Sequence, residues 1–324
     1  MSVIIPTYDY ERFLKNSIDS VLHQTWRDIE IIVVDDGSTD GTRKIAESYG
    51  KSVTYIYQQN KGVTAAMNNG AKRAKVEFIC FLSSDDMYMP EIIARQLSVF
   101  NDNPQVELVY TDYYYVNGQG QILETMKCPF FENFEDRILW MFRYCYFMHD
   151  TVMFRRTLLE KVGFWDEDMH YAGEYWMWFK CLKDSKVAHI PLPLVKYRIH
   201  GAQLTTHTKQ VRRYRRETLR RARKLYGLTW AIKSWFLTSR IFGAYWLIQG
   251  LLFSDRYYGL YWAKHSLGLG EGILGKYLQL KGLKKGISEK KEKEKLTMTE
   301  RLCLFAFSTV NRVRSVLAGA EGAQ

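Results

Sequence analysis

The sequence predicts an α/β protein with a doubly wound, mostly parallel sheet, followed by a basic, amphipathic helical extension. Short apolar segments alternate with segments of helical periodicity from residue 2 to residue 111, the pattern of such sheets. The charge is divided, because residues 205–324 hold 24 Lys and Arg against 8 Asp and Glu, and residues 1–204 hold 22 against 27. We therefore expect a folded domain at 1–204 and an extension at 205–324.

The expected elements alternate along the chain. Val3 lies in a strand stopped by Pro6, and apolar residues at helical spacing after Tyr10 predict an amphipathic helix. Each crossover between parallel strands requires a long connection, commonly a helix, and the later elements fit that requirement. They are strands at 30–34, 53–57, 77–82 and 106–111, and helices at about 40–49, 62–74, 90–100 and 173–182.

Two of the apolar strands end in paired aspartates. The segment 78–82 is followed by Ser83-Ser84-Asp85-Asp86, and the segment 31–34 by Asp35-Asp36. Ligands of open α/β sheets bind outside the carboxyl ends of the strands, so we expect one acidic site there. A turn is the structural alternative, since Ser and Asp favour turns. The repetition on two strands favours a site for a divalent cation or ribose hydroxyls.

Seven stretches, taken in order, resemble family 2 glycosyltransferases of the nucleotide-sugar-binding GT-A fold. Each stretch alone is weak, but their order over residues 2–204 is specific. From 113 to 170 the pattern loosens into aromatic-rich segments, which we expect to form the acceptor-side half. The matching stretches are Val3–Tyr8, Val34–Asp40, Asn60–Gly62, Leu82–Asp86, Gly163–Glu167, Gly173–Tyr175 and Tyr197–His200.

The resemblance implies a role for individual residues. Asp36 would hydrogen-bond the nucleotide base, and Asp85 would bind Mn²⁺ or Mg²⁺, with Asp86 and His200 as further candidate ligands. Glu174 would be the general base that deprotonates the acceptor, although a Glu at a helix start is commonly only a favourable charge. The nucleotide-sugar site would contain Pro6, Thr7, Tyr8, Asp36, Asn60, Gly62, Asn68, Ser83, Ser84 and Asp85. The acceptor side would contain His149, Asp150, Trp165 and Asp166.

Two positions depart from the family pattern. Ser83 replaces the usual first Asp of the DXD motif, so the metal would depend on Asp85, water and diphosphate oxygens. Met67 replaces a common Arg, which leaves Lys61, Lys72 or Arg73 as candidate partners of the diphosphate. The nature of the donor is therefore less constrained than the fold.

The extension predicts attachment to a membrane surface. Residues 208–226 place apolar side chains near one helical face and seven arginines largely on the other. The uninterrupted apolar run 241–253 is too short to span ~30 Å of hydrocarbon, but Trp, Tyr and basic residues suit the interface. The alternative is a helical subdomain that packs on protein. Nucleic acid is disfavoured because no recognisable binding module occurs.

We expect a metal-dependent inverting glycosyltransferase that moves a sugar from a nucleotide diphosphate, with UDP favoured, to a glycan or lipid-linked saccharide of the cell surface. Five scattered cysteines and no evident signal peptide favour the cytoplasm, at the inner face of the membrane. A degenerate nucleotide-sugar-binding scaffold and a nucleotidyltransferase remain alternatives, although the latter needs a glycine-rich loop after the first strand. A dinucleotide oxidoreductase would need G-x-G-x-x-G there, which is absent.

Overall fold

The computed structural model describes residue 230 and residues 1–227, apart from 172, 184, 202 and 207. The chain divides into two compact units, Met1–Leu228 and Thr229–Gln324. The predicted division lay at 204 and 205, so the first unit extends further than expected. The predicted surface segment at 241–253 lies outside the described residues.

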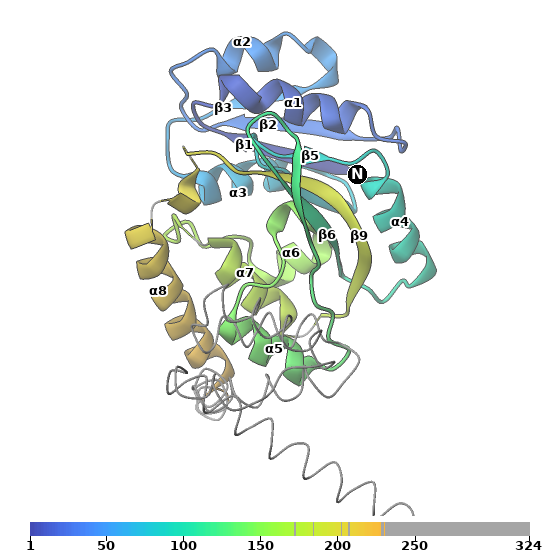
Figure 1. Ribbon diagram of the computed structural model, residues 1–324, viewed down its shortest axis with the longest axis vertical. Coiled ribbons are helices and arrows are strands. Elements are labelled where there is room, and N and C mark those ends of the chain that lie inside the picture. Colours follow the sequence, from blue (N-terminus) through green and yellow to red (C-terminus); the bar gives the residue numbers. More distant parts are fainter. Residues whose placement is uncertain (172, 184, 202, 207, 228–229, 231–324) are drawn as a thin grey trace, which may run out of the picture. The chain divides into compact units, whose positions relative to one another are not determined.

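The first half of the sheet is parallel, as the sequence predicted. Its strand order is β3-β2-β1-β4, and all three neighbouring pairs run parallel. Helices α1 and α2 lie on one face of these strands and α3 lies on the other (Figure 1). The strands are β1 Ser2–Thr7, β2 Glu30–Asp35, β3 Thr54–Tyr57 and β4 Phe78–Phe81, and the helices are α1 Glu11–Leu22, α2 Thr42–Glu47 and α3 Val63–Arg73.

Burial explains why these apolar segments form central strands. Every residue of β1 is buried, and only Glu30 of β2 is exposed, because both faces are covered by helices. Helix α3 approaches β1 closely at Gly70, where an added Cβ would lie 2.5 Å from Cγ2 of Ile4. The tight packing fixes the position of the strand ends that carry the site.

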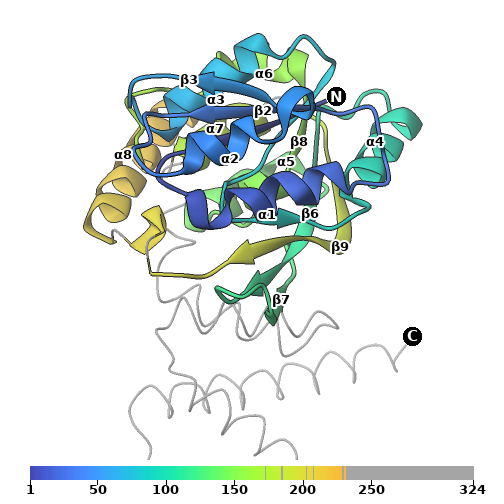
Figure 2. The ribbon, with the colours of Figure 1, turned by 90° about the horizontal axis from the view of Figure 1, so that it is seen from above.

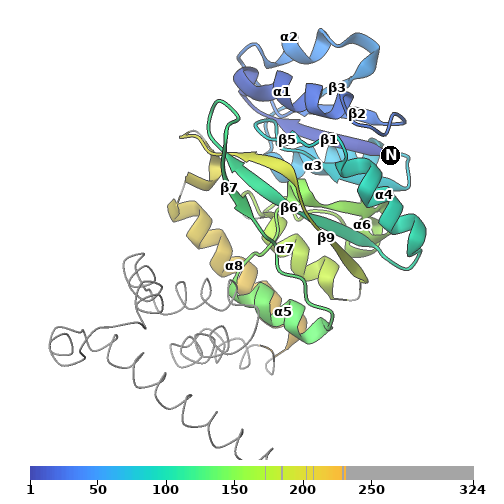
Figure 3. The same cartoon turned by 45° about the vertical axis from the view of Figure 1, so that its right-hand side comes forward.

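The second half of the sheet is mixed. Strand β8 joins β4 and β6 antiparallel, and β9 lies parallel beside β6 (Figures 2 and 3). The sequence predicted only a short strand where β6 forms and no strand where β9 forms. The remaining elements are β5 Met87–Tyr88, α4 Ile92–Asp102, β6 Leu108–Val116, β7 Ile122–Met126, α5 Phe134–Arg143, β8 Met153–Arg155, α6 Arg156–Val162, α7 Gly173–Leu182, β9 Val187–Arg198 and α8 Thr208–Tyr226, with short 3-10 helices at Gly50–Ser52, His149–Thr151 and Leu204–Thr206.

Helix α8 belongs to the first unit because its less polar face packs on α7 (Figure 1). The Tyr226 hydroxyl donates to the Phe179 carbonyl at 2.6 Å, and Ala222 is fully buried. Six of the seven predicted arginines are exposed, while Arg221 is half-buried. Within the part of the chain that the structure describes, no helix is both long and apolar enough to cross a membrane.

Candidate active site

The two acidic strand ends meet at one edge of the sheet. Strand β1 lies between β2 and β4, so the turns that follow all three strands are neighbours. The amide of Asp36 donates to Thr7 O at 2.9 Å, and the amide of Leu82 donates to Ile4 O at 2.9 Å. The two acidic turns therefore lie together at the carboxyl ends of these strands, where ligands of open α/β sheets bind.

Asp36 supports the loop that follows β3. Its Oδ1 accepts from Gln58 Nε2 at 2.7 Å and from the Lys61 amide at 2.9 Å, and its Oδ2 accepts from the Gly62 amide at 2.8 Å. A carboxylate has about four acceptor positions, so one remains. The side chain is 3% exposed. The hydrogen bond between Asp36 and a nucleotide base thus stays a prediction, and the carboxylate has one acceptor position available for it.

The other residues predicted at the donor pocket surround this edge. Pro6 and Thr7 are buried, and Thr7 Oγ1 has no hydrogen-bond partner in the described structure. An unpaired buried hydroxyl is costly, and a ligand could relieve that cost. Tyr8 is 47% exposed and Asn60 is exposed, so both are accessible. Gly62 has φ of +92°, a conformation that favours glycine.

Asp85 lies at the centre of the second acidic turn. Its Oδ2 is 2.9 Å from His200 Nε2, and it also forms a hydrogen bond with Tyr10. The His200 ring packs against Phe13 with centroids 4.9 Å apart. Burial raises the pKa of Asp85, the His200 contact opposes this, and repulsion by Asp150 adds to it, with a net rise above the usual value. The surroundings therefore favour a positive charge near this carboxylate.

Asp86 faces the protein interior, which differs from the metal-ligand role that we expected. It is completely buried, and its Oδ1 accepts from the Arg198 amide at 2.7 Å. Burial, together with repulsion from Asp150 and Asp85, raises the pKa of this carboxyl well above its usual value. Asp86 therefore joins the Ser83–Asp86 turn to the end of β9.

His149 and Asp150 contact the same acidic turn. Asp150 Oδ1 accepts from the Ser83 amide at 2.6 Å, and His149 Nε2 lies 3.1 Å from Ser83 Oγ. Asp150 is 1% exposed, and Ser84 in the turn is also buried. The structure therefore places these two residues at the Ser83–Asp86 turn, where the sequence analysis had assigned them to the acceptor side.

The residues present can hold a divalent cation only with help from the donor. Asp85 supplies one oxygen and His200 one nitrogen, and the pKa of Asp85 is raised by burial of its charge and, to a smaller extent, by repulsion from Asp150. Among the described residues, no group of three His, Cys, Asp or Glu side chains is arranged around a metal position. Diphosphate and water oxygens would have to complete the shell, as expected from the replacement by Ser83.

Asn68 and Trp165 form a clamp, a role that sequence reasoning missed. Asn68 Nδ2 donates to Trp165 O at 2.8 Å and Asn68 Oδ1 accepts from Trp165 N at 3.0 Å. Trp165 is 3% exposed, with its ring 4.5 Å from that of Phe81. We had expected Asn68 to contact the donor and Trp165 to contact the acceptor, but both residues are buried and bind each other. The clamp joins α3 to the loop that leads to α7.

Asp166 forms an ion-pair network with α7 and α8. Its Oδ1 accepts from Lys180 Nζ at 2.7 Å, and its Oδ2 accepts from Trp176 Nε1 at 2.7 Å and from Arg221 at 3.0 Å. Burial alone would raise the pKa of Asp166, but these hydrogen bonds and charges hold it below its usual value. Such a carboxylate is a weak base, so the predicted acceptor contact is better replaced by a structural role.

Glu174 differs from Asp166 because its carboxylate has no hydrogen bond or ion pair to any described residue. It is half-buried in the first turn of α7, and burial together with the negative charge of Glu174 raises the pKa of the nearby Cys145 thiol. Gly173 holds this turn close to α3, since an added Cβ would lie 2.6 Å from Thr64 Cγ2. The geometry thus presents an ionisable, unengaged carboxylate at a fixed helix terminus.

Three supporting residues escaped the sequence analysis. Tyr10 contacts Asp85, Ser17 Oγ donates to Asp86 O at 2.7 Å, and Arg198 Nε donates to Asp85 O at 2.8 Å. Arg198 occurs in the quoted stretch 197–200, which was the available signal for it. Nothing local marks Tyr10 or Ser17, because their partners lie far away in the sequence.

The sequence comparisons identify the family of this chain. The model of the family described as Glycosyl transferase family 2 matches residues 2–163. An uncharacterized glycosyltransferase of Rickettsia typhi is 37% identical over 219 residues, which cover 66% of this chain and 69% of that protein. Another from Methanocaldococcus jannaschii is 29% identical over 206 residues, covering 61% and 70%. The chain belongs to glycosyl transferase family 2 and is a glycosyltransferase, as the sequence predicted.

Solved structures share the fold. S. aureus TarS 1–349 in complex with UDP-GlcNAc matches with a TM-score of 0.55 and 21% identity, over 67% of this chain and 64% of that one. The UDP complex matches with a TM-score of 0.54 and 20% identity, over 86% and 77%. The chain spans only 36% of a longer TarS chain. The likeness confirms the predicted GT-A-type fold.

Proposed function

We propose that this protein is a metal-dependent inverting transferase that moves a sugar from a nucleotide diphosphate to a hydroxyl of a glycan or lipid-linked saccharide. The observation that carries the proposal is the contrast between Asp85, held at the sheet edge by His200, and Glu174, whose carboxylate is unengaged. UDP is the favoured nucleotide, since solved TarS structures of the same fold contain UDP-GlcNAc and UDP.

In this mechanism each residue has a separate task. Thr7 and Asp36 bind the nucleotide at the ends of β1 and β2, and Asp85 with His200 would hold the cation. A bound Mn²⁺ or Mg²⁺ would supply charge neutralisation at the departing diphosphate. Glu174 accepts the proton of the attacking hydroxyl through its carboxylate. Attack on the anomeric carbon then occurs in one displacement, with inversion of configuration.

We further propose a cytoplasmic position on the inner membrane face, with the acceptor used in cell-surface polysaccharide or glycolipid synthesis. The exposed arginines of α8 support this placement, because basic helical faces are attracted to anionic headgroups. The Trp- and Tyr-rich sequence after residue 229 is a second supporting feature.

A thermal-shift panel tests the donor. Full-length protein is heated with UDP-, GDP-, dTDP- and CMP-linked sugars, each with Mg²⁺, Mn²⁺ or a chelator. We expect stabilisation by a UDP-sugar that increases with Mn²⁺ and is lost in Asp36→Ala. The absence of stabilisation by every donor, or equal stabilisation of Asp36→Ala, contradicts the proposal. Donor binding without UDP release on addition of candidate acceptors would indicate a scaffold.

A further inference from the structure

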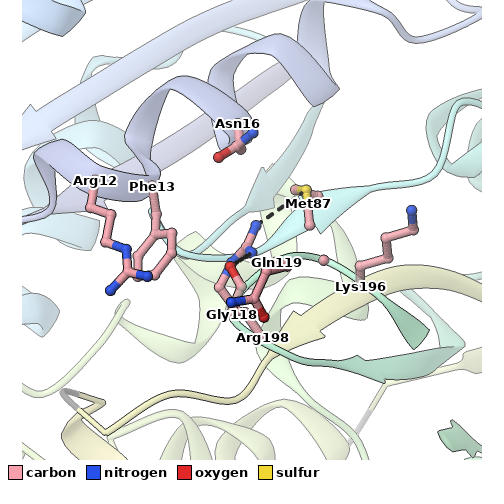
Figure 4. Close-up of a pocket in the computed structure, with 9 residues that line it drawn as sticks. Arg12, Phe13, Asn16, Met87, Gly118, Gln119, Lys196 and Arg198 are labelled. Carbon is pink, nitrogen blue, oxygen red and sulfur yellow. Dashed lines mark hydrogen bonds between the residues drawn. The ribbon is translucent and has the colours of Figure 1, made fainter. Parts of the chain in front are cut away.

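A pocket lies beside the Ser83–Asp86 turn. It has a volume of about 400 Å³ and is bounded by α1, β5, β9 and the turn between β6 and β7 (Figure 4). Helix α1 contributes Arg12, Phe13 and Asn16, and β9 contributes Lys196 and Arg198. A volume of this order is sufficient for a small ligand.

The pocket is lined by three cationic side chains and by no carboxylate. Within the described structure, the side chains of Arg12 and Lys196 have neither a hydrogen bond nor an ion pair. The guanidinium carbons of Arg12 and Arg198 lie 5.0 and 4.7 Å from the centroid of the same Phe13 ring. Positive charge is therefore concentrated in this hollow.

The walls of the pocket are fixed before any ligand arrives. Arg198 is 3% exposed, and its Nη1 donates to Gly118 O at 2.7 Å, which ties β9 to the turn. Asn117 Oδ1 accepts from the amides of Gln119 and Gln121, both at 3.0 Å, and so stabilises the turn itself. A preformed site loses less conformational entropy when it binds.

Helical and strand periodicity places these polar side chains along two walls of the pocket. Arg12 and Asn16 are one turn apart on α1, and Lys196 and Arg198 share one face of β9. Figure 4 shows Arg12 and Asn16 extending from α1 and Lys196 extending from β9 on the side opposite Arg12, with Arg198 between them. Arginine binds phosphate oxygens in pairs, lysine supplies a compact charge, and the asparagine amide adds a neutral donor.

We propose that this pocket binds a phosphate group at a site separate from the diphosphate of the sugar donor. Arg12 and Asn16 contact the phosphate oxygens, and Lys196 adds its charge from the opposite wall. Arg198 contributes its charge, because its Nε and Nη1 donate to main-chain carbonyls and its Nη2 lies 3.5 Å from Met87 Sδ. The Arg198 bond to Asp85 O at 2.8 Å links the pocket to the acidic turn. A soluble phosphate compound and a phospholipid headgroup offer the same chemistry.

Titration calorimetry with inorganic phosphate tests the proposal in full-length protein, without divalent cations and with excess UDP. We expect one phosphate per chain, bound about tenfold more weakly by Arg12→Gln/Lys196→Gln because one charge-assisted contact and a second positive charge of the lining are lost. Asn16→Asp, which adds a negative charge and alters a single exposed side chain, should weaken binding similarly. The matched control Lys51→Gln/Lys161→Gln removes two exposed charges elsewhere and should bind as the wild type does.

A second arm distinguishes the source of the phosphate. If Arg12→Gln/Lys196→Gln also weakens binding to phosphatidylglycerol vesicles relative to phosphatidylcholine vesicles, the site takes a headgroup. If only the titration with inorganic phosphate weakens, the site takes a soluble phosphate compound, and both results support the pocket. Equal phosphate affinity in wild type and Asn16→Asp, displacement of phosphate by UDP, or equal weakening in the control overturns the proposal.

Discussion

Replacing Asn68 by Ala tests whether this residue positions the loop before α7 or contacts the donor. The change leaves the Trp165 amide and carbonyl without their partners in a buried setting. Each unpaired buried group costs about 1–3 kcal/mol, so we expect a loss of about 4 kcal/mol in the free energy of unfolding. Chemical denaturation of the full chain, followed by tryptophan fluorescence, measures this loss.

The neighbouring Asn69 provides a matched control on the same helix. Its Nδ2 donates only to Gln58 Oε1, at 2.7 Å, and the residue is half-buried, so Asn69→Ala should cost about 1 kcal/mol or less. The folded fraction of Asn68→Ala should keep the donor affinity of the wild type. Unfolding like that of Asn69→Ala, combined with a large loss of donor affinity, would refute the clamp and restore the donor contact.

Three further predictions address the metal, the ion-pair network and α8. Asp85→Asn should leave the melting temperature without metal unchanged or raised, because the cost of burying the charge and its repulsion by Asp150 are removed. The same change should abolish stabilisation by Mn²⁺ with donor, whereas Ser83→Ala should be milder. Retained Mn²⁺ stabilisation in Asp85→Asn would exclude the ligand role. Because the folded-state pKa of Asp166 is depressed, its stabilising contribution is present above the unfolded pKa of about 3.9 and is lost as the pH falls through the lower folded value. Asp166→Asn should therefore flatten the acid limb of stability against pH, and an unchanged slope would contradict this. Arg212→Gln/Arg213→Gln/Arg216→Gln should weaken binding to anionic vesicles by about 3 kcal/mol, roughly 100-fold at low salt, and salt should weaken the wild type as well; equal flotation of both proteins would refute surface attachment.

The sequence predicted the parallel half of the fold because its signals are local. Apolar runs, helical spacing and the aspartates after two strands depend on neighbouring residues, and the structure brings Asp36 and Asp85 to one edge accordingly. The two aspartates come together because β2 and β4, which carry them at their ends, both pair with β1. By contrast, β9 carries Pro191 and Pro193 and has no regular alternation, so its pairing with β6 was not predictable from periodicity.

Side-chain orientation was the part that sequence could not supply. Asn68 and Asp86 have residue types suited to ligands, yet packing turns one toward Trp165 and the other toward Arg198. Asp166 and Glu174 are both acidic, and only the structure shows that the first is neutralised by Lys180. Such distinctions depend on contacts between residues distant in the sequence, which residue type does not encode.

The phosphate pocket has the same origin. Arg12 and Lys196 are 184 positions apart in the sequence, and each alone would be interpreted as an ordinary surface charge. Their place in one pocket depends on the short strand β5, which pairs with β9 and brings it beside α1. Folding therefore creates a local positive charge. The overall composition of the first 204 residues does not reveal it, because that composition is acidic.

Glu174→Gln gives the most direct test of the proposed reaction. Donor affinity and the rate of acceptor-dependent UDP release are measured on the same preparation, with a UDP-sugar and Mn²⁺. A general base contacts the acceptor hydroxyl and not the nucleotide, so donor affinity should be retained while turnover falls by about 10² to 10⁴-fold. Turnover near that of the wild type would remove Glu174 from the mechanism and contradict the proposed base.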